Sequence, residues 1–162
     1  MMLIRTSIAP SAIQGIGLFS QDFVPKGTLI WRLHEKLDVQ MSANEILALP
    51  PHMQEFVRIY SYPHLKRDGY VVLDSDNGRF MNHSETPNTD FRDFYRGLAL
   101  EDIQPGAELT CDYRELFPTF QGFGPTGEEI LPPADVQTDA ALVSALPLAT
   151  QAVSHTRRPQ GA

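Results

Sequence analysis

Three polar side chains of different chemistry follow one another at Asn82, His83 and Ser84, between an apolar pair at Phe80–Met81 and a turn at Pro87–Asn88. An amide, an imidazole and a hydroxyl can bind a polar ligand, ligate a metal or pair a nucleophile with its base. Adjacent residues in an extended segment point to opposite faces, so His83 and Ser84 do not form a catalytic pair. Ligand binding and metal ligation remain to be considered.

Metal chemistry is not supported by the pattern of ligand-type residues. No second histidine, cysteine or carboxylate lies at metal-ligand spacing from His83. Cys111 is the single cysteine of the chain, so neither an internal disulfide nor a cysteine-rich zinc site can form. We therefore predict no metal. A reactive thiolate would need a nearby base or cation, and a small buried thiol is the simpler interpretation of Cys111.

Two further stretches contain candidate site residues. The turn Gly15-Ile16-Gly17 could bring the backbone close to a ligand, or could only relieve a tight turn before a strand. It is not a dinucleotide fingerprint, because no third glycine and no βαβ pattern follow it. In the stretch ELTCDY, Cys111 and Tyr113 are two residues apart, so both face the same side of a predicted strand.

Short apolar runs between turn residues predict a body built mainly of β-strands. The runs are LIRTSIA, GIGLFS, FVPKGTLIWRL, GYVVLD, FYRGLAL and ELTCDY. A short helical insert interrupts them, where Ser42 and Glu45 form a capping box and Pro51 can begin a second helix. A stripe at helical spacing follows, of which we expect the first three members in the core: Met53, Phe56, Val57 and Tyr60.

Length, charge and composition set the broad class. The 162 residues suit a domain at 1–123 and a disordered tail at 124–162, which is rich in Pro, Ala, Thr and Gln and has no aromatic residue. A net charge of −7 argues against direct nucleic-acid binding and favours a basic partner. No apolar run reaches the roughly 18 residues of a membrane span, and the first residues lack the apolar segment of about 7–15 residues that is typical of a signal peptide. We expect no membrane association and a cytoplasmic location.

Taken in order, GIGLF, RFMNHSETPN and GLALEDIQPGAELTCDY resemble the SET-domain family of protein-lysine methyltransferases over residues 4–117. The resemblance implies a mainly β fold of the SET-type β-clip, with a short helical insert and several small curved sheets. It also implies a C-terminal pseudoknot, in which the last strand threads a loop. The implied cofactor is S-adenosylmethionine, and the implied reaction is methyl transfer to the lysine amine of a basic protein or peptide.

The resemblance assigns roles to particular residues. Tyr113 matches the catalytic tyrosine of the family. The residues that match the cofactor site are Gly15, Ile16, Gly17, Arg79, Asn82, His83 and Tyr113. The candidates for the substrate channel are Tyr60, Tyr62, Cys111 and Phe117. Cys111 stands where the family usually carries Phe or Tyr, and this smaller side chain predicts room for a second or third methyl group.

The chain departs from the family pattern after its central motif. Glu85 stands where many members have a cysteine, and the cysteine-rich zinc segment beyond the last tyrosine is missing. We expect FPTFQGF, residues 117–123, to cover the cofactor instead. The sequence leaves two alternatives open: a binding module with little or no transfer activity, and methylation of a small amine. It also leaves a homodimer open.

Overall fold

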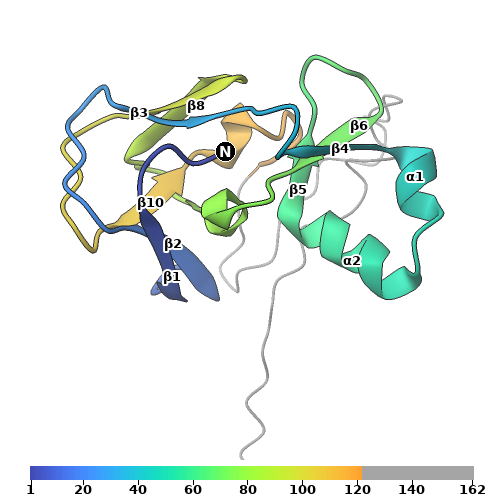
Figure 1. The fold of residues 1–162 in the computed structure, drawn as a ribbon, viewed down its shortest axis with the longest axis horizontal. Helices are drawn as coiled ribbons and strands as arrows, with labels where there is room; N and C mark the ends of the chain where they lie inside the picture. The colour runs from blue at the N-terminus through green and yellow to red at the C-terminus, as the bar shows by residue number, and fades with distance from the viewer. Residues whose placement is uncertain (122–162) are drawn as a thin grey trace, which may run out of the picture.

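The computed structural model describes residues 1–121, so the predicted tail at 124–162 lies outside the described part. Three small sheets form the body (Figure 1). The first has the order β1 (Thr6–Pro10), β2 (Ile16–Ser20), β10 (Glu108–Cys111), β7 (Asn82–His83). The second has the order β3 (Leu29–Arg32), β9 (Arg96–Ala99), β8 (Thr89–Asp93), and the third β4 (Val39–Ser42), β6 (Tyr70–Leu73), β5 (Ser61–Pro63). The predicted mainly β architecture of several small sheets is confirmed.

The helical insert connects two strands of the third sheet and lies at one end of the molecule (Figure 1). It consists of α1 (Ala43–Leu47) and α2 (Pro51–Tyr60), and the predicted capping box of Ser42 and Glu45 is present. The core stripe is confirmed for Val57, which is buried, but wrong for Met53, which is 38% exposed because little of the protein covers the first turn of α2. Within residues 1–121, neither helix is long or apolar enough to cross a bilayer.

One apolar core joins the first two sheets to the third. Trp31 of β3 and Phe91 of β8 pack with their ring centroids 5.5 Å apart, and both are at least 95% buried. Leu18 and Leu109, at the centre of the first sheet, are fully buried in the same cluster. Burial of this aromatic and aliphatic surface is the main force that holds the three small sheets together.

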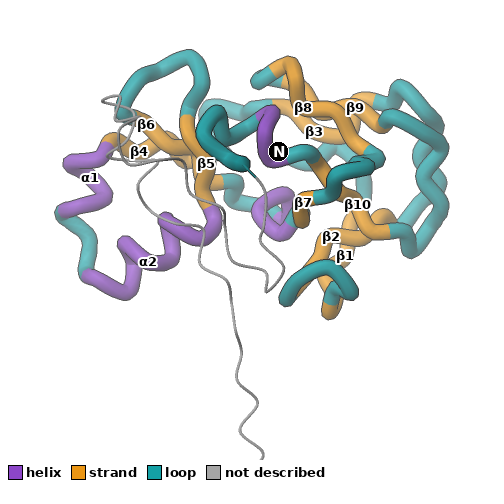
Figure 2. Tube along the Cα trace, turned by 180° about the vertical axis from the view of Figure 1, so that it is seen from behind, coloured by secondary structure: helices purple, strands orange, loops and turns teal. Residues whose placement is uncertain are grey.

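The last strand is inserted between two others that are distant in sequence. β10 pairs antiparallel with β2 on one side and parallel with β7 on the other (Figure 2). The 3₁₀ turn η2 (Tyr113–Glu115) follows, and the Glu115 carboxylate accepts a 2.7 Å hydrogen bond from the Phe91 backbone N–H. β10 and the turn after it are therefore held by segments from distant parts of the sequence, as the predicted pseudoknot requires.

Asn88 attaches the loop after β7 to β10. Its Nδ2 donates to the Glu108 carbonyl at 2.8 Å, and its Oδ1 accepts from the Thr110 N–H at 2.9 Å. The Asn88 side chain thus bonds the backbone of β10 in the way that a neighbouring strand would. The next residue adds a third contact, because the Thr89 hydroxyl donates to the Thr110 carbonyl at 2.7 Å.

Replacing Asn88 with alanine should destabilise the whole domain. We expect the free energy of unfolding to fall by about 2–3 kcal/mol, because a backbone donor and a backbone acceptor of β10 lose their partner. Chemical denaturation followed by tryptophan fluorescence of Trp31 measures this change. Asn44→Ala, at an exposed position of α1, is the matched control and should change stability by less than about 0.5 kcal/mol. Equal stability of the two variants would contradict the role of Asn88.

Candidate functional site

The parallel pairing of β7 with β10 brings two sequence motifs to one place. Cys111 is the register partner of His83, and Tyr113 follows two residues later. The Tyr113 backbone N–H donates to His83 Nδ1 at 3.2 Å, and the Tyr113 hydroxyl donates to the Met81 carbonyl at 2.9 Å. The predicted catalytic tyrosine and the predicted Asn-His pair are therefore neighbours, although about 30 residues of chain separate them.

The Tyr113 phenol is a neutral hydrogen-bond donor. Burial raises its pKa well above the usual tyrosine range, because the phenolate would lose its hydration. Tyr113 therefore cannot act as a phenolate base near neutral pH. Its hydroxyl can orient a neighbouring polar group, and the Met81 carbonyl beside it offers an acceptor.

Asn82 connects the central motif to the glycine turn. Its Nδ2 donates to the Gln14 carbonyl at 3.1 Å, the Ile16 carbonyl at 3.3 Å and Glu108 Oε1 at 2.9 Å. Its Oδ1 accepts no hydrogen bond from any residue of 1–121 and remains available to a donor. The structure thus brings Gly15–Gly17 and Asn82 together, as the sequence predicts for a cofactor site.

Glu108 is a site residue that the sequence reasoning missed. Both its carboxylate oxygens accept from the Ser11 hydroxyl, at 2.8 and 2.9 Å, in addition to the bond from Asn82. A Cβ at Gly17 would come within 2.3 Å of Glu108 Oε1, so a larger residue there would displace this carboxylate. The glycine turn therefore serves the packing of Glu108 as well as any ligand.

A narrow pocket of about 60 Å³ opens beside Tyr113. The four predicted channel residues all line it: Tyr60, Tyr62, Cys111 and Phe117. Tyr113 and Arg79, both predicted at the cofactor site, line the same pocket, whereas Asn82, His83 and the glycine turn do not. Arg79 Nη1 donates to the backbone carbonyls of residues 74–76 at 3.1–3.4 Å. These positions are observed, and the roles assigned to the residues stay predictions.

The Cys111 thiol forms part of the pocket wall. It is 98% buried, and burial raises its pKa far above that of a free thiol. Cys111 is therefore a small neutral side chain and not a nucleophile, which agrees with the simpler of the two interpretations drawn from the sequence.

Asp74 is the second residue that the sequence reasoning missed. It follows β6 directly, in the stretch DSDNG, which has the composition of a surface turn. The structure instead buries it to 95% and places it in the pocket wall. Asp74 Oδ1 accepts a hydrogen bond from the Tyr62 hydroxyl at 3.2 Å. Polarity alone predicted a turn, whereas the position at the end of a buried strand determines where the side chain points.

Surface charges connect the central motif to the chain end. Because the Tyr113 N–H occupies His83 Nδ1, the ring proton lies on Nε2 and is donated to Glu85 Oε1 at 3.1 Å. Arg114 donates to Glu85 Oε2 at 2.8 Å and to the Asp112 carboxylate at 2.8 and 2.9 Å. Glu85 therefore joins the two segments at the position where the sequence predicted a departure from the family.

Aromatic rings cover the same region. Phe120 is 96% buried, and its ring centroid lies 4.9 Å from His83 and 5.5 Å from Tyr113. Phe117 lies 5.4 Å from Tyr113. Two rings of the segment predicted as a cover thus pack beside Tyr113, while its last two residues, 122 and 123, lie outside the described part. Within residues 1–121, no group of three or more side chains could hold a metal ion.

The fold and site define a small β protein whose last strand lies between two strands that are distant in sequence. The family model of the SET domain matches residues 15–114, and the chain belongs to that family. A search among proteins of curated function finds no match.

Solved structures agree with this fold. The Chaetomium thermophilum Polycomb Repressive Complex 2, in an autoinhibited conformation bound to S-adenosylmethionine, superposes with a TM-score of 0.53 at 20% identity over 71% of this chain. A humanized mutant of that complex, bound to the inhibitor GSK126, gives 0.52 at 20% identity over 80%. This chain spans only 16% and 19% of the length of those chains. The likeness shows the shared fold.

The bridge through Glu85 should contribute to stability in a pH-dependent way. The hydrogen bond from His83, together with the Arg114 cation, holds the pKa of Glu85 below its usual range. Its contribution is therefore complete above the ordinary carboxyl pKa and is lost as the pH falls through the lowered value. The Glu85 and Arg114 side chains are 66% and 49% exposed, so we expect Glu85→Gln to lower Tm by only about one or two degrees at pH 7.

Thermal unfolding at pH 7 and again in acid measures this effect. The difference between Glu85→Gln and the parent should vanish in acid, where Glu85 is protonated in both states. Glu101→Gln, at an exposed position, serves as the control, and Arg114→Gln should remove most of the same increment. A Tm difference that persists unchanged in acid would argue against the bridge.

Proposed function

We propose that the chain is a protein-lysine N-methyltransferase that uses S-adenosylmethionine. One observation carries the proposal: the Tyr113 phenol, fixed on the Met81 carbonyl, stands between the Asn82–His83 pair and a narrow pocket with aromatic walls. A narrow apolar pocket suits the straight stem of a lysine side chain. Membership of the SET-domain family supports the same reaction class.

The residues around the glycine turn fit the proposed cofactor. S-adenosylmethionine supplies an electrophilic methyl group on a sulfonium, and it carries an adenine ring and an amino-acid end. Asn82 Oδ1 would accept a hydrogen bond from the amino group. Ile13, before the turn, and Ile16, within it, are 51% and 45% exposed and would pack against the ring. Backbone carbonyls such as that of Met81 would contact the polarised methyl group by weak C–H···O interactions.

The protein must make the substrate amine nucleophilic and align it. A free lysine has a pKa of about 10.4, so only about one molecule in 2,500 is neutral at pH 7. The buried pocket disfavours the ammonium form, because burial penalises charge. The aromatic walls and the Tyr113 hydroxyl would restrict the nitrogen to one position, and alignment supplies a large part of the rate.

The substrate is proposed as a basic protein or peptide, because the chain carries a net charge of −7. A binding module that retains the scaffold without activity is the alternative, and methylation of a small amine is a third candidate. The fixed Tyr113 hydroxyl favours an enzyme over a module. Cytoplasmic location and pairing into a homodimer stay predictions.

Loss of the Tyr113 hydroxyl should abolish most of the transfer. We expect Tyr113→Phe to lower kcat at least about tenfold while S-adenosylmethionine binding is retained, because the hydroxyl acts mainly on alignment. Transfer of a radiolabelled methyl group to core histones and ribosomal proteins gives the rate, and calorimetry gives the affinity. Tyr95→Phe, at a tyrosine that is 49% exposed, is the control. Absence of transfer by the parent protein, despite cofactor binding, would favour the binding module.

The volume of the Cys111 side chain should decide how many methyl groups are added. We expect di- and trimethyl-lysine from the parent protein under excess cofactor, because the small thiol leaves room for a larger amine. Cys111→Tyr should shift the product to monomethyl-lysine by filling part of the pocket. Mass spectrometry of the modified substrate separates the three products. Only monomethyl-lysine from the parent would show that other residues limit the pocket.

A further inference from the structure

A carboxyl group lies in the wall of the pocket that the lysine would enter. Asp74 shares this wall with Tyr62, Cys111 and Tyr113. Its Oδ1 accepts a hydrogen bond from the Tyr62 hydroxyl, whereas its Oδ2 accepts none from any residue of 1–121. The residue is 95% buried, yet Oδ2 is not one of the enclosed polar atoms without a partner, so this oxygen is open to a group that enters the pocket.

The backbone beside Asp74 is shaped to accommodate this carboxyl. Gly78, at the start of η1 (Asn77–Phe80), lies against it: a Cβ there would come within 2.7 Å of Asp74 Oδ2. Arg79 follows Gly78 in the sequence. Its Nη1 donates hydrogen bonds to the backbone carbonyls of residues 74–76, and no ion pair joins it to the Asp74 carboxylate. Arg79 therefore does not neutralise this carboxyl.

We propose that Asp74 accepts the proton that the lysine amine must lose before it attacks, with Tyr62 positioning the carboxylate. This inference rests on the proposed methyltransferase function. The substrate ammonium gives one proton to Asp74 Oδ2 and becomes a neutral amine. The nitrogen lone pair then forms the N–C bond as the C–S bond of the sulfonium donor breaks, and the sulfur keeps that electron pair. Asp74 afterwards releases the proton to water.

The charges around Asp74 are compatible with this role. Burial is the main cause that raises its pKa to about 7, and repulsion from Asp38 and Asp76 adds to it. The Met1 amino group and the bond from Tyr62 act in the opposite direction. Cys111, also near, is neutral. The same burial lowers the pKa of a lysine amine that enters the pocket, so the two values approach one another, which favours proton transfer.

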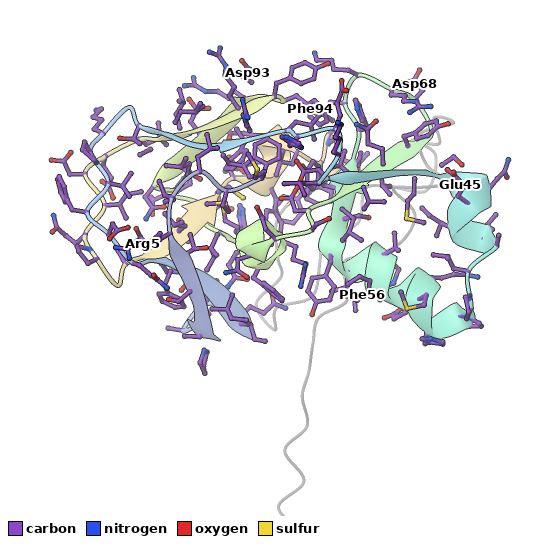
Figure 3. The ribbon with its side chains drawn as sticks, viewed as in Figure 1. Arg5, Glu45, Phe56, Asp68, Asp93 and Phe94 are labelled. Atoms are coloured by element: carbon purple, nitrogen blue, oxygen red, sulfur yellow. The ribbon has the colours of Figure 1, made fainter. Side chains whose placement is uncertain are left out.

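The test is the pH dependence of kcat for methyl transfer to core histones. The parent rate should rise through about pH 7 and then level off, because Asp74 must be ionised to act. In Asp74→Asn we expect at least a tenfold loss at pH 7.5, followed by a steady rise of kcat with pH until the rates nearly meet at pH 10. Affinity for S-adenosylmethionine, measured by calorimetry, should stay unchanged. Asp68→Asn, in the exposed turn before β6, is the matched control (Figure 3).

The outcomes separate this inference from the proposed function. No transfer by the parent protein overturns both. Transfer by the parent with an equal loss at every pH in Asp74→Asn, or with no loss, overturns only the role of Asp74. Tyr62→Phe provides a second measurement if Asp74→Asn does not fold: loss of the Tyr62 bond raises the pKa of Asp74, so the rise of kcat should move to higher pH. An unmoved profile in Tyr62→Phe counts against the proposal.

Discussion

The parallel pairing of β7 with β10 is the contact on which the site depends. Each strand contributes only two residues to it, Asn82 and His83 against Thr110 and Cys111. Two register pairs are too few to hold a strand alone, and the pairing closes a long loop at a cost in chain entropy. Side chains of the loop after β7 add stabilising contacts to this short pairing, since Asn88 forms hydrogen bonds with β10 on both sides of Leu109. The domain therefore forms its site and its topology by the same contacts.

The sequence predicted most of the elements but not this pairing. Strands such as β2 and β6 have apolar runs that are long enough to recognise, and the capping box of Ser42 identified the helical insert. β7 shows no hydrophobic periodicity, because a strand of two residues is too short for an alternating pattern to appear. The resemblance to a family supplied the threading, and local propensity could not have done so.

Two acidic residues show why part of the site escaped prediction. In the fold, Glu108 lies against Gly17 and Asp74 lies against Gly78. In the sequence, Glu108 is far from Gly17, and Asp74 lies in a stretch with the composition of a turn. Glu108 is partly buried and Asp74 is buried, and both positions depend on where neighbouring strands end, which is a tertiary property. Carboxylates usually face solvent, so an acid that is bonded by Ser11 and Asn82, or buried beside Tyr62, departs from its usual preference. Such conflicts between local and tertiary preference are typical of functional positions.

The pocket is an environment that keeps groups neutral. Burial raises the pKa of Tyr113 and Cys111 so far that neither ionises near neutral pH, and it raises that of Asp74 to about 7. The same desolvation acts on an incoming ammonium with the opposite effect on its pKa, because burial always disfavours the charged form. Of the three groups, Asp74 alone changes its charge within the physiological range. A pocket that makes amines neutral also makes this carboxyl a better proton acceptor, so one physical cause prepares both partners of the transfer.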